Sequence, residues 1–381
     1  MKRVTCLFTL ALVAIVAIPS IAYCDWVKTS APYATLSEAS VRAILCTNQR
    51  VFAASDTYGI IVSDDRGDNW TEAFASPPYW VRCLASRGNE IFAGMYANVY
   101  HSLDNGVTWS TLGTGLPNDD IVSVTADADI LLAATLTNWL YRYSPQTSTW
   151  ELVQSGLRSN VGFSVQKTAS HLFAGVGVGG GFYESNDNGY SWTMRAFGNR
   201  YNAPVISIAE TDSLLVLGTS AGLFTQRIGS NSWISSLGHS ALSIAVSGSY
   251  VIAAGSSVNV YYLGTQWYST SLQLNALSVA TDGVYAYVGS EHLGLYRSLL
   301  TDLPCCAQSS VRGNLDGTGI TNLADLSVMV SYLTAGSTSI SCPVAGDLDG
   351  TGVVDIADLS GLVNYLTGGD YVLRACPMIT N

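Results

Sequence analysis

The sequence predicts an all-β propeller of seven blades, followed by a small α-helical unit. A strand pattern recurs seven times between residues 51 and 296, and six of the seven copies are followed by a tryptophan. After residue 304 the pattern gives way to two nearly identical acidic, glycine-rich loops, each followed by a helical pattern. Repeats of this length that hold several short strands are typical of propeller blades.

The repeat is centred on an apolar run that ends on a small residue. Neighbouring copies are 34–43 residues apart, and each is followed by a second apolar pair such as Leu140-Tyr141. Four short strands fit this period. Small residues suit the inner strands, where blades converge on the axis, and aromatic residues suit the wider gaps further out. The runs end at Ala54, Gly94, Ala134, Gly175, Gly218, Gly255 and Gly289.

The seventh copy lacks both its tryptophan and an outer strand. Near the N-terminus, Asp25-Trp26-Val27-Lys28 stands without a repeat of its own. We expect this segment to be the missing outer strand of the seventh blade, with Trp26 in the place that the other tryptophans hold. Closing the ring in this way leaves no open sheet edge between the first and last blades.

The N-terminus predicts export. Lys2 and Arg3 precede an apolar run from Cys6 to Ile18, and small residues near Ala22 suit cleavage, so residues 1–22 have the features of a secretory signal peptide. The run is shorter than the roughly 20 residues that a membrane-spanning helix needs, and no later segment qualifies. We expect a secreted, extracellular or cell-surface protein. A periplasmic location and lipidation of Cys24 are the alternatives.

Composition argues against nucleic acid as a partner. Charged residues make up 12% of the chain, the net charge is −11, and there are three lysines. Such a surface repels phosphate backbones. Export permits disulfides, and their pairing stays open. Four of the eight cysteines fall in the small C-terminal unit, namely Cys305, Cys306, Cys342 and Cys376.

Three repeats carry the same turn, with the pattern S-x-D-x-G-x-x-W. In this turn the aspartate accepts backbone N–H bonds, the glycine supplies a positive φ, and the tryptophan covers the hairpin. The turns are Ser63–Trp70, Ser102–Trp109 and Ser185–Trp192. They resemble the Asp-box (BNR) repeats of sialidases, sortilin-like receptors and related secreted propellers, over residues 25 to about 300. The resemblance implies a structural role away from the ligand face, so Asp65, Asp104 and Asp187 are not catalytic candidates.

A ligand face is expected where the loops that lead into each blade meet the loops between its middle strands. Exposed aromatic residues with scattered Arg, Asp and His suit glycan or peptide binding, although the same residues also occur in ordinary loops. These candidates are Asp56, Tyr58, Tyr79, Trp80, Tyr96, Asp119, Asp120, Trp139, Arg200, Tyr201, His239, Glu291 and His292. No Arg-Ile-Pro segment of the sialidase type occurs. A glycoside hydrolase or lyase, with two carboxylates across the face, is the alternative.

Residues 305–381 form the second predicted unit, in which 313–336 and 346–369 are copies offset by 33 residues. Each copy has the oxygen ligands and the glycine, Gly319 or Gly352, of a calcium loop before an apolar helix face. Two helix-capping loops without metal are the alternative. The expected Ca²⁺ ligands are Asn314, Asp316, Thr318, the Ile320 carbonyl, Asn322 and Asp325 in the first loop, and Asp347, Asp349, Thr351, the Val353 carbonyl, Asp355 and Asp358 in the second.

This unit resembles the duplicated dockerin domain, whose helices bind cohesin modules in cellulosomal proteins. The resemblance implies Ca²⁺ as the cofactor and a cohesin-like or cell-surface partner. It departs from the family in Thr318 and Thr351 at position 5, and in the apolar Leu323-Ala324 and Ile356-Ala357 at positions 10 and 11.

The sequence thus favours a secreted, non-catalytic binding or surface-display protein. The propeller, residues 23–304, would bind a glycan or protein ligand, and the C-terminal unit would dock. A propeller that serves only as a spacer is a further alternative.

Overall fold

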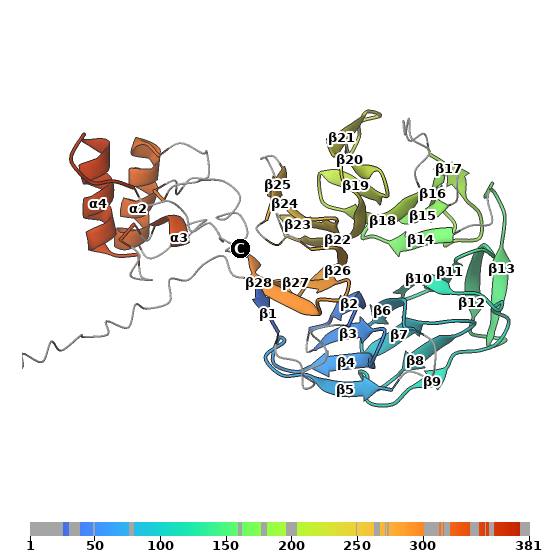
Figure 1. The fold of residues 1–381 in the computed structure, drawn as a ribbon. Helices are drawn as coiled ribbons and strands as arrows, with labels where there is room; N and C mark the ends of the chain where they lie inside the picture. The colour runs from blue at the N-terminus through green and yellow to red at the C-terminus, as the bar shows by residue number, and fades with distance from the viewer. Residues whose placement is uncertain are drawn as a thin grey trace, which may run out of the picture.

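The computed structural model contains seven four-stranded sheets arranged as blades around one axis, with three helices outside the ring among the described residues (Figure 1). The expected seven-bladed all-β propeller is therefore confirmed. The structure describes residues 26–29, 39–48, 50–75, 80–158, 162–176, 181–195, 204–248, 250–262, 267–270, 272, 274–300, 312–313, 315, 321–335, 343–346, 348–349 and 354–373. The signal-peptide and Cys24 predictions lie outside these residues.

The first four blades each contain four consecutive antiparallel strands. Blade 1 holds β2 (Val41–Cys46), β3 (Val51–Ser55), β4 (Gly59–Ser63) and β5 (Thr71–Phe74). Blade 2 holds β6 (Cys83–Arg87), β7 (Glu90–Gly94), β8 (Val99–Ser102) and β9 (Ser110–Thr111). Blade 3 holds β10 (Ile121–Asp127), β11 (Ile130–Thr135), β12 (Leu140–Ser144) and β13 (Thr149–Val153). Blade 4 holds β14 (Gly162–Lys167), β15 (Leu172–Val176), β16 (Gly181–Ser185) and β17 (Thr193–Met194).

The remaining blades follow the same order, except that the last takes a strand from the N-terminus. Blade 5 holds β18 (Val205–Glu210), β19 (Leu214–Thr219), β20 (Gly222–Arg227) and β21 (Trp233–Leu237). Blade 6 holds β22 (Ala241–Ser247), β23 (Tyr250–Gly255), β24 (Val258–Tyr262) and β25 (Trp267–Ser269). Blade 7 holds β26 (Ala276–Thr281), β27 (Tyr285–Ser290), β28 (Leu295–Leu299) and β1 (Val27–Lys28).

The N-terminal strand closes the ring, as the sequence predicts. In β1, Val27 pairs with Arg297 and Lys28 pairs with Tyr296. The amide of Thr29 extends the ladder with a hydrogen bond to the carbonyl of Leu295 at 3.0 Å. The last blade therefore joins the two ends of the propeller chain, which protects the third strand of that blade from solvent.

Each junction between neighbouring blades contains one of the tryptophans that mark the repeats. In every case the tryptophan belongs to the outer part of one blade and packs in the apolar cluster shared with the preceding blade. Trp26 occupies this place between blades 6 and 7, as expected. The other six are Trp70, Trp109, Trp150, Trp192, Trp233 and Trp267.

The small residue at the end of each second strand has a steric cause. A Cβ atom added to Gly175 or to Gly289 would collide with a serine of the first strand and with the backbone of the next blade. These serines hold the blades together near the axis. For example, the hydroxyl of Ser278 donates to the carbonyl of Val41 at 3.0 Å, which links blade 7 to blade 1.

The C-terminal unit contains α2 (Leu323–Ala335), α3 (Pro343–Gly346) and α4 (Ile356–Leu366). The α2 and α4 helices contact each other, and Met329 and Leu362 are fully buried in their shared apolar cluster. The expected helical patterns are therefore present. Val330 and Val363 lie on the same helices, but each is 39% exposed.

Candidate functional site

Two sets of loops meet at one end of the ring, which we call the mouth. One set leads into each blade, and the other joins its second and third strands. Because neighbouring strands are antiparallel, the remaining turns of each blade lie at the opposite end. The described candidates all fall in mouth loops, whereas Tyr79, Arg200 and Tyr201 lie outside the described residues.

Trp80 is the centre of a charged cluster at the mouth. Its side chain is 46% exposed. The guanidinium carbon of Arg42 lies 4.6 Å from the Trp80 ring centre, and that of Arg82 lies 5.3 Å from it. Both distances allow cation–π attraction. Trp80 is therefore an accessible aromatic surface held between two positive charges.

Two of the expected acidic residues pair with these arginines. Asp120 lies 2.7 Å from Arg82, and Asp56 lies 3.8 Å from Arg42. In both arginines the Nε atom is buried and has no hydrogen-bond partner among the described residues. A buried donor without a partner costs free energy, so these two Nε–H groups are a local cost of placing the arginines beside Trp80.

Asp56 also connects blade 1 to blade 7. Its Oδ1 atom accepts the backbone N–H of Ser40 at 3.1 Å. The Ser40 hydroxyl lies 3.3 Å from Nδ1 of the exposed His292. The neighbouring Glu291 donates its backbone N–H to the carbonyl of Asn275. The structure therefore brings Asp56, Trp80 and His292 to the same side of the mouth as the two arginines.

Other expected residues have a different setting. The carboxylate of Asp119 is buried and accepts hydrogen bonds from the Thr137 amide at 2.7 Å, the Thr137 hydroxyl and the Asn138 side chain. Burial acts to raise the pKa of Asp119, but these hydrogen bonds outweigh it and lower the pKa. Asp119 therefore anchors the loop between β11 and β12.

The aromatic candidates differ in exposure. Tyr96 is 36% exposed. Trp139 and Tyr58 are only partly exposed, because they pack against the apolar clusters of their blade junctions. His239 is exposed in the loop that leads into blade 6. Of the aromatic candidates in the described part of the mouth, Trp80 presents the largest exposed fraction.

The sequence reasoning missed Arg42 and Arg82. They occupy the same place in successive repeats. Each comes directly before the residue that pairs with the small residue of the second strand, which is Ala43 in blade 1 and Cys83 in blade 2. The β2–β3 ladder shifts register at Arg42, so this residue leaves the regular pairing. In the other five blades the corresponding residues are the apolar Val122, Phe163, Ile206, Leu242 and Leu277. A comparison of the repeats at this position would have identified the two arginines.

The three S-x-D-x-G-x-x-W turns lie between the third and fourth strands, at the end opposite the mouth. In the first turn, Oδ1 of Asp65 accepts the Ser63 hydroxyl at 2.8 Å and the Asn69 amide at 2.7 Å. The backbone and side-chain bonds from Asn69 lower the pKa of Asp65 to about 2. Asp104 and Asp187 make the same bonds within their own turns, and their pKa values are also lowered.

Each C-terminal loop sequence ends in a buried carboxylate, Asp325 or Asp358. Asp325 accepts the backbone N–H groups of Leu315 and Asn322, and Asp358 accepts those of Asp349 and Asp355. Burial raises the pKa of Asp358, and the charge of Asp349 raises it further. A carboxylate in such a setting fits a cation site, because a cation would offset both effects.

The described loop residues also cap the helices. Asp355 accepts the Ala357 N–H at 2.7 Å and forms a capping box with Asp358. Such capping is expected both for calcium-binding loops and for helix-capping loops without metal, so it does not distinguish the two. Among the described residues no group of three His, Cys, Asp or Glu side chains is placed to hold a metal ion. The other expected ligands, Asn314, Asp316, Thr318, Ile320, Asp347, Thr351 and Val353, lie outside them.

Comparison with known proteins identifies a fold. No family model and no protein of curated function matches the sequence. In the described part of the chain, no helix has the length and apolar character to cross a bilayer. One similar structure is the extracellular domain of a protein assigned to the one-component systems of B. thetaiotaomicron, with 18% identity and a TM-score of 0.60. It covers 72% of this chain, and this chain spans 40% of its length.

Two other similar structures have different roles. YCF48 bound to D1 peptide is 14% identical with a TM-score of 0.57, and the match covers 74% of this chain and 100% of YCF48. The GH74 enzyme of Niastella koreensis is 16% identical with a TM-score of 0.54, and the match covers 68% of this chain and 52% of the enzyme. At these identities the likeness shows a common fold, the seven-bladed β-propeller.

Proposed function

We propose that this chain is a secreted, non-catalytic binding protein of the Asp-box propeller type, which holds a glycan or protein ligand at its mouth. The supporting observation is the exposed Trp80 ring between Arg42 and Arg82. A sugar or aromatic ring would contact the exposed part of the indole, and an acidic group would pair with the guanidinium groups of the arginines. Extracellular and peptide-bound neighbours with the same fold are compatible with this role.

The mouth favours binding over hydrolysis. A glycosidase general acid needs a raised pKa, whereas the pKa of Asp119 is lowered by its hydrogen bonds. Asp56 and Asp120 are engaged by arginines. The GH74 neighbour supports the hydrolase alternative through its fold alone.

A Trp80→Ala variant of the mature protein tests the mouth. Wild-type protein is screened on glycan and peptide arrays, and the best ligand is then titrated. We expect Trp80→Ala to weaken binding about tenfold or more, because an aromatic anchor is lost. Tyr190→Ala is the matched control, since Tyr190 is also exposed and lies under an arginine but at the opposite end of the propeller. Equal loss in both variants, or turnover of the ligand, would contradict the proposal.

We further propose that the C-terminal unit is a dockerin-like domain that binds Ca²⁺ through the two loops and docks to a cohesin-like or surface partner. Two ions would be held, one by the six expected ligands of each loop, and they would supply charge compensation for the buried Asp325 and Asp358. Calorimetry on the full chain tests this, with Asp358→Ala as the variant and the exposed Asp370→Ala as the control. Absence of Ca²⁺ heat and of a Ca²⁺-dependent Tm shift would refute it.

A further inference from the structure

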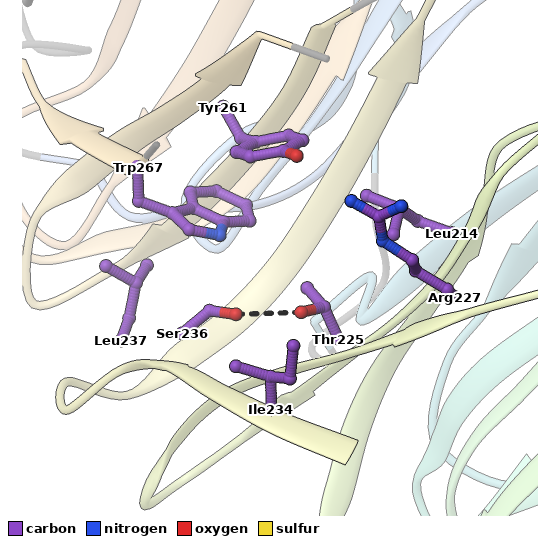
Figure 2. A pocket seen from close by; sticks show the side chains of 8 residues that line it. All are labelled: Leu214, Thr225, Arg227, Ile234, Ser236, Leu237, Tyr261 and Trp267. Carbon is purple, nitrogen blue, oxygen red and sulfur yellow. Dashed lines mark hydrogen bonds between the residues drawn. The ribbon is translucent and has the colours of Figure 1, made fainter. Parts of the chain in front are cut away.

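The junction between blades 5 and 6 contains an open cavity of about 460 Å³ (Figure 2). Strands β19, β20 and β21 of blade 5 line one side, and β24 and β25 of blade 6 line the other. In Figure 2, Arg227 lies across the cavity from Tyr261 and Trp267. This position is on the outer part of the ring and is distinct from the Trp80 cluster of the mouth, which is built from blades 1, 2, 3 and 7.

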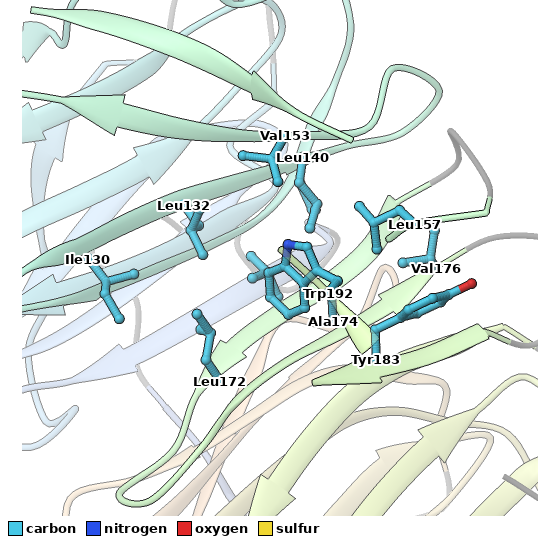
Figure 3. Packing of buried hydrophobic residues seen from close by; sticks show 12 residues of the cluster. Ile130, Leu132, Leu140, Val153, Leu157, Leu172, Ala174, Val176, Tyr183 and Trp192 are labelled. Carbon is cyan, nitrogen blue, oxygen red and sulfur yellow. The ribbon is translucent and has the colours of Figure 1, made fainter. Parts of the chain in front are cut away.

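The corresponding junction between blades 3 and 4 is filled (Figure 3). There Trp192 is almost fully buried among side chains of both blades, including Leu132 and Leu140. Gly189 of the S-x-D-x-G-x-x-W turn packs so closely on Leu132 that an added Cβ atom would lie 2.8 Å from that side chain. The turn therefore acts as a wedge in the outer gap between the two blades.

Each of the three wedges also binds an arginine of the preceding blade. The acceptor is always the carbonyl of the residue before the turn glycine. Arg50 donates to Asn105 at 3.0 Å, and Arg142 donates to Asn188 at 3.2 Å. Arg297 donates to the carbonyl of Arg66 in the same way. A filled junction thus pairs an arginine with a fixed oxygen atom.

Blade 6 does not carry this turn. Its connection from β24 to β25 lies at residues 263–266, and the serine, aspartate and glycine pattern is missing from its sequence. On the blade 5 side, Val216 stands where blades 1, 3 and 7 have Phe52, Leu132 and Tyr287. This junction therefore lacks both the turn sequence and the larger side chain of the junctions that carry the turn.

The side chains that line the cavity define its chemistry. Arg227 is exposed, and within the described chain its side chain makes no ion pair or hydrogen bond. The half-buried Tyr261 and Trp267 rings lie 5.3 Å apart and form an aromatic wall. The hydroxyls of Thr225 and Ser236 lie 2.9 Å from each other at the base, and each keeps further hydrogen-bonding capacity.

We propose that this cavity binds a carboxylated sugar residue, namely a uronic acid within an oligosaccharide. The carboxylate would accept two parallel N–H groups of Arg227. The apolar face of the sugar ring would lie on Trp267, and its hydroxyls would bond to Thr225 and Ser236. The volume suits one or two sugar residues, since ligand sites of a few hundred Å³ are usual. A peptide is less suited, because only side-chain hydroxyls line the base.

Ligand-observed NMR titration of the mature protein with digalacturonate and with neutral galactobiose tests this assignment. We expect the acidic disaccharide to bind at least about tenfold more tightly, because the neutral disaccharide lacks the carboxylate that would form the charge-assisted hydrogen bonds. Arg227→Gln should remove that preference, and Arg227→Lys should keep part of it, because lysine retains the charge without the planar fork. Since Arg227 is exposed, both variants should keep the wild-type Tm.

Two controls separate this site from other regions. Arg142→Gln removes an arginine that is already paired with a wedge, so the digalacturonate preference should persist. Trp80→Ala removes the proposed mouth anchor and should leave the preference unchanged, which makes failure here distinguishable from failure of the mouth proposal. Equal affinity for the two disaccharides, or an undiminished preference in Arg227→Gln, would overturn the inference.

Discussion

The Nε atom of Arg142 donates a hydrogen bond to the backbone carbonyl of Asn188 across the junction between blades 3 and 4. The same guanidinium lies 4.3 Å from the ring centre of Tyr190, two residues further along the turn. One side chain therefore contacts both the backbone and the exposed aromatic residue of the neighbouring blade. This contact explains how a surface turn contributes to the cohesion of the ring.

Replacing Arg142 by methionine should lower the free energy of unfolding by about 1 kcal/mol, because the interblade hydrogen bond, a second hydrogen bond to the carbonyl of Asp129 and one cation–π contact are lost. The apolar stem of methionine keeps much of the packing. Arg227→Met is the matched control and should change stability by less than about 0.5 kcal/mol, since Arg227 has no such partner among the described residues. Urea denaturation measures both. Equal effects would show that the wedge contact is not stabilising.

Replacing Trp26 by alanine should destabilise the closed ring by about 2–3 kcal/mol. The side chain packs in the cluster between blades 6 and 7, but only partly buried, so the loss falls at or below the range for a buried tryptophan. Trp26→Phe should recover most of it. Removing residues 26–29 should in addition expose the edge of β28 and promote association. Light scattering and thermal unfolding test these expectations, and a monomeric deletion variant with unchanged Tm would contradict them.

The aspartate turns predict a loss of stability in strong acid. The folded-state pKa of Asp65 is about 2, below its ordinary value near 4, and those of Asp104 and Asp187 are lowered as well. Their contribution is complete above about pH 4 and is lost as the pH falls through the folded-state values. Replacing all three by asparagine should flatten the dependence of Tm on pH between 4 and 2. An unchanged slope would mean that other carboxylates cause it.

Gly175→Ala should destabilise the propeller by about 2 kcal/mol or more. The added methyl group would press on the Ser164 hydroxyl and on the backbone of Val205 in the next blade, and a backbone atom moves only with its strand. Gly238→Ala is the control, because open space surrounds that position and its φ is not positive. Chemical denaturation should separate the two variants clearly. Similar stabilities would argue against the steric explanation of the small residue.

The blade count and the ring closure could be predicted because they depend on local patterns. The apolar run with its small terminal residue recurs through the chain. The seventh copy is incomplete and Trp26 has no repeat of its own, so the simplest arrangement places the Trp26 segment in the seventh blade. The structure adds the reason for the small residue, which is the contact of Gly289 with Ser278 and with Val41 of the first blade. That contact joins residues far apart in the sequence, so no local pattern contains it.

The mouth was predicted less completely. Loop position indicated Trp80, Asp56 and Asp120 as candidates. Arg42 lies in β2 and Arg82 lies just before β6, and their place beside Trp80 appears only when the two blades are placed side by side. Asp119 and Trp139 met the same sequence criteria, yet one anchors a loop and the other packs in a junction. Exposure and pairing depend on neighbours from other repeats.

The sequence by itself determined the repeat, the number of blades, the closing segment and the duplicated acidic loops, because each of these follows from residue identity and spacing. Tertiary structure alone decided which arginine side chains have a hydrogen-bond partner in the next blade. Arg142 meets a turn from the next blade, whereas Arg227 faces a cavity with no such turn. The physical reason is that a charge is neutralised by whatever lies within a few ångströms, and in a propeller those neighbours come from the next repeat.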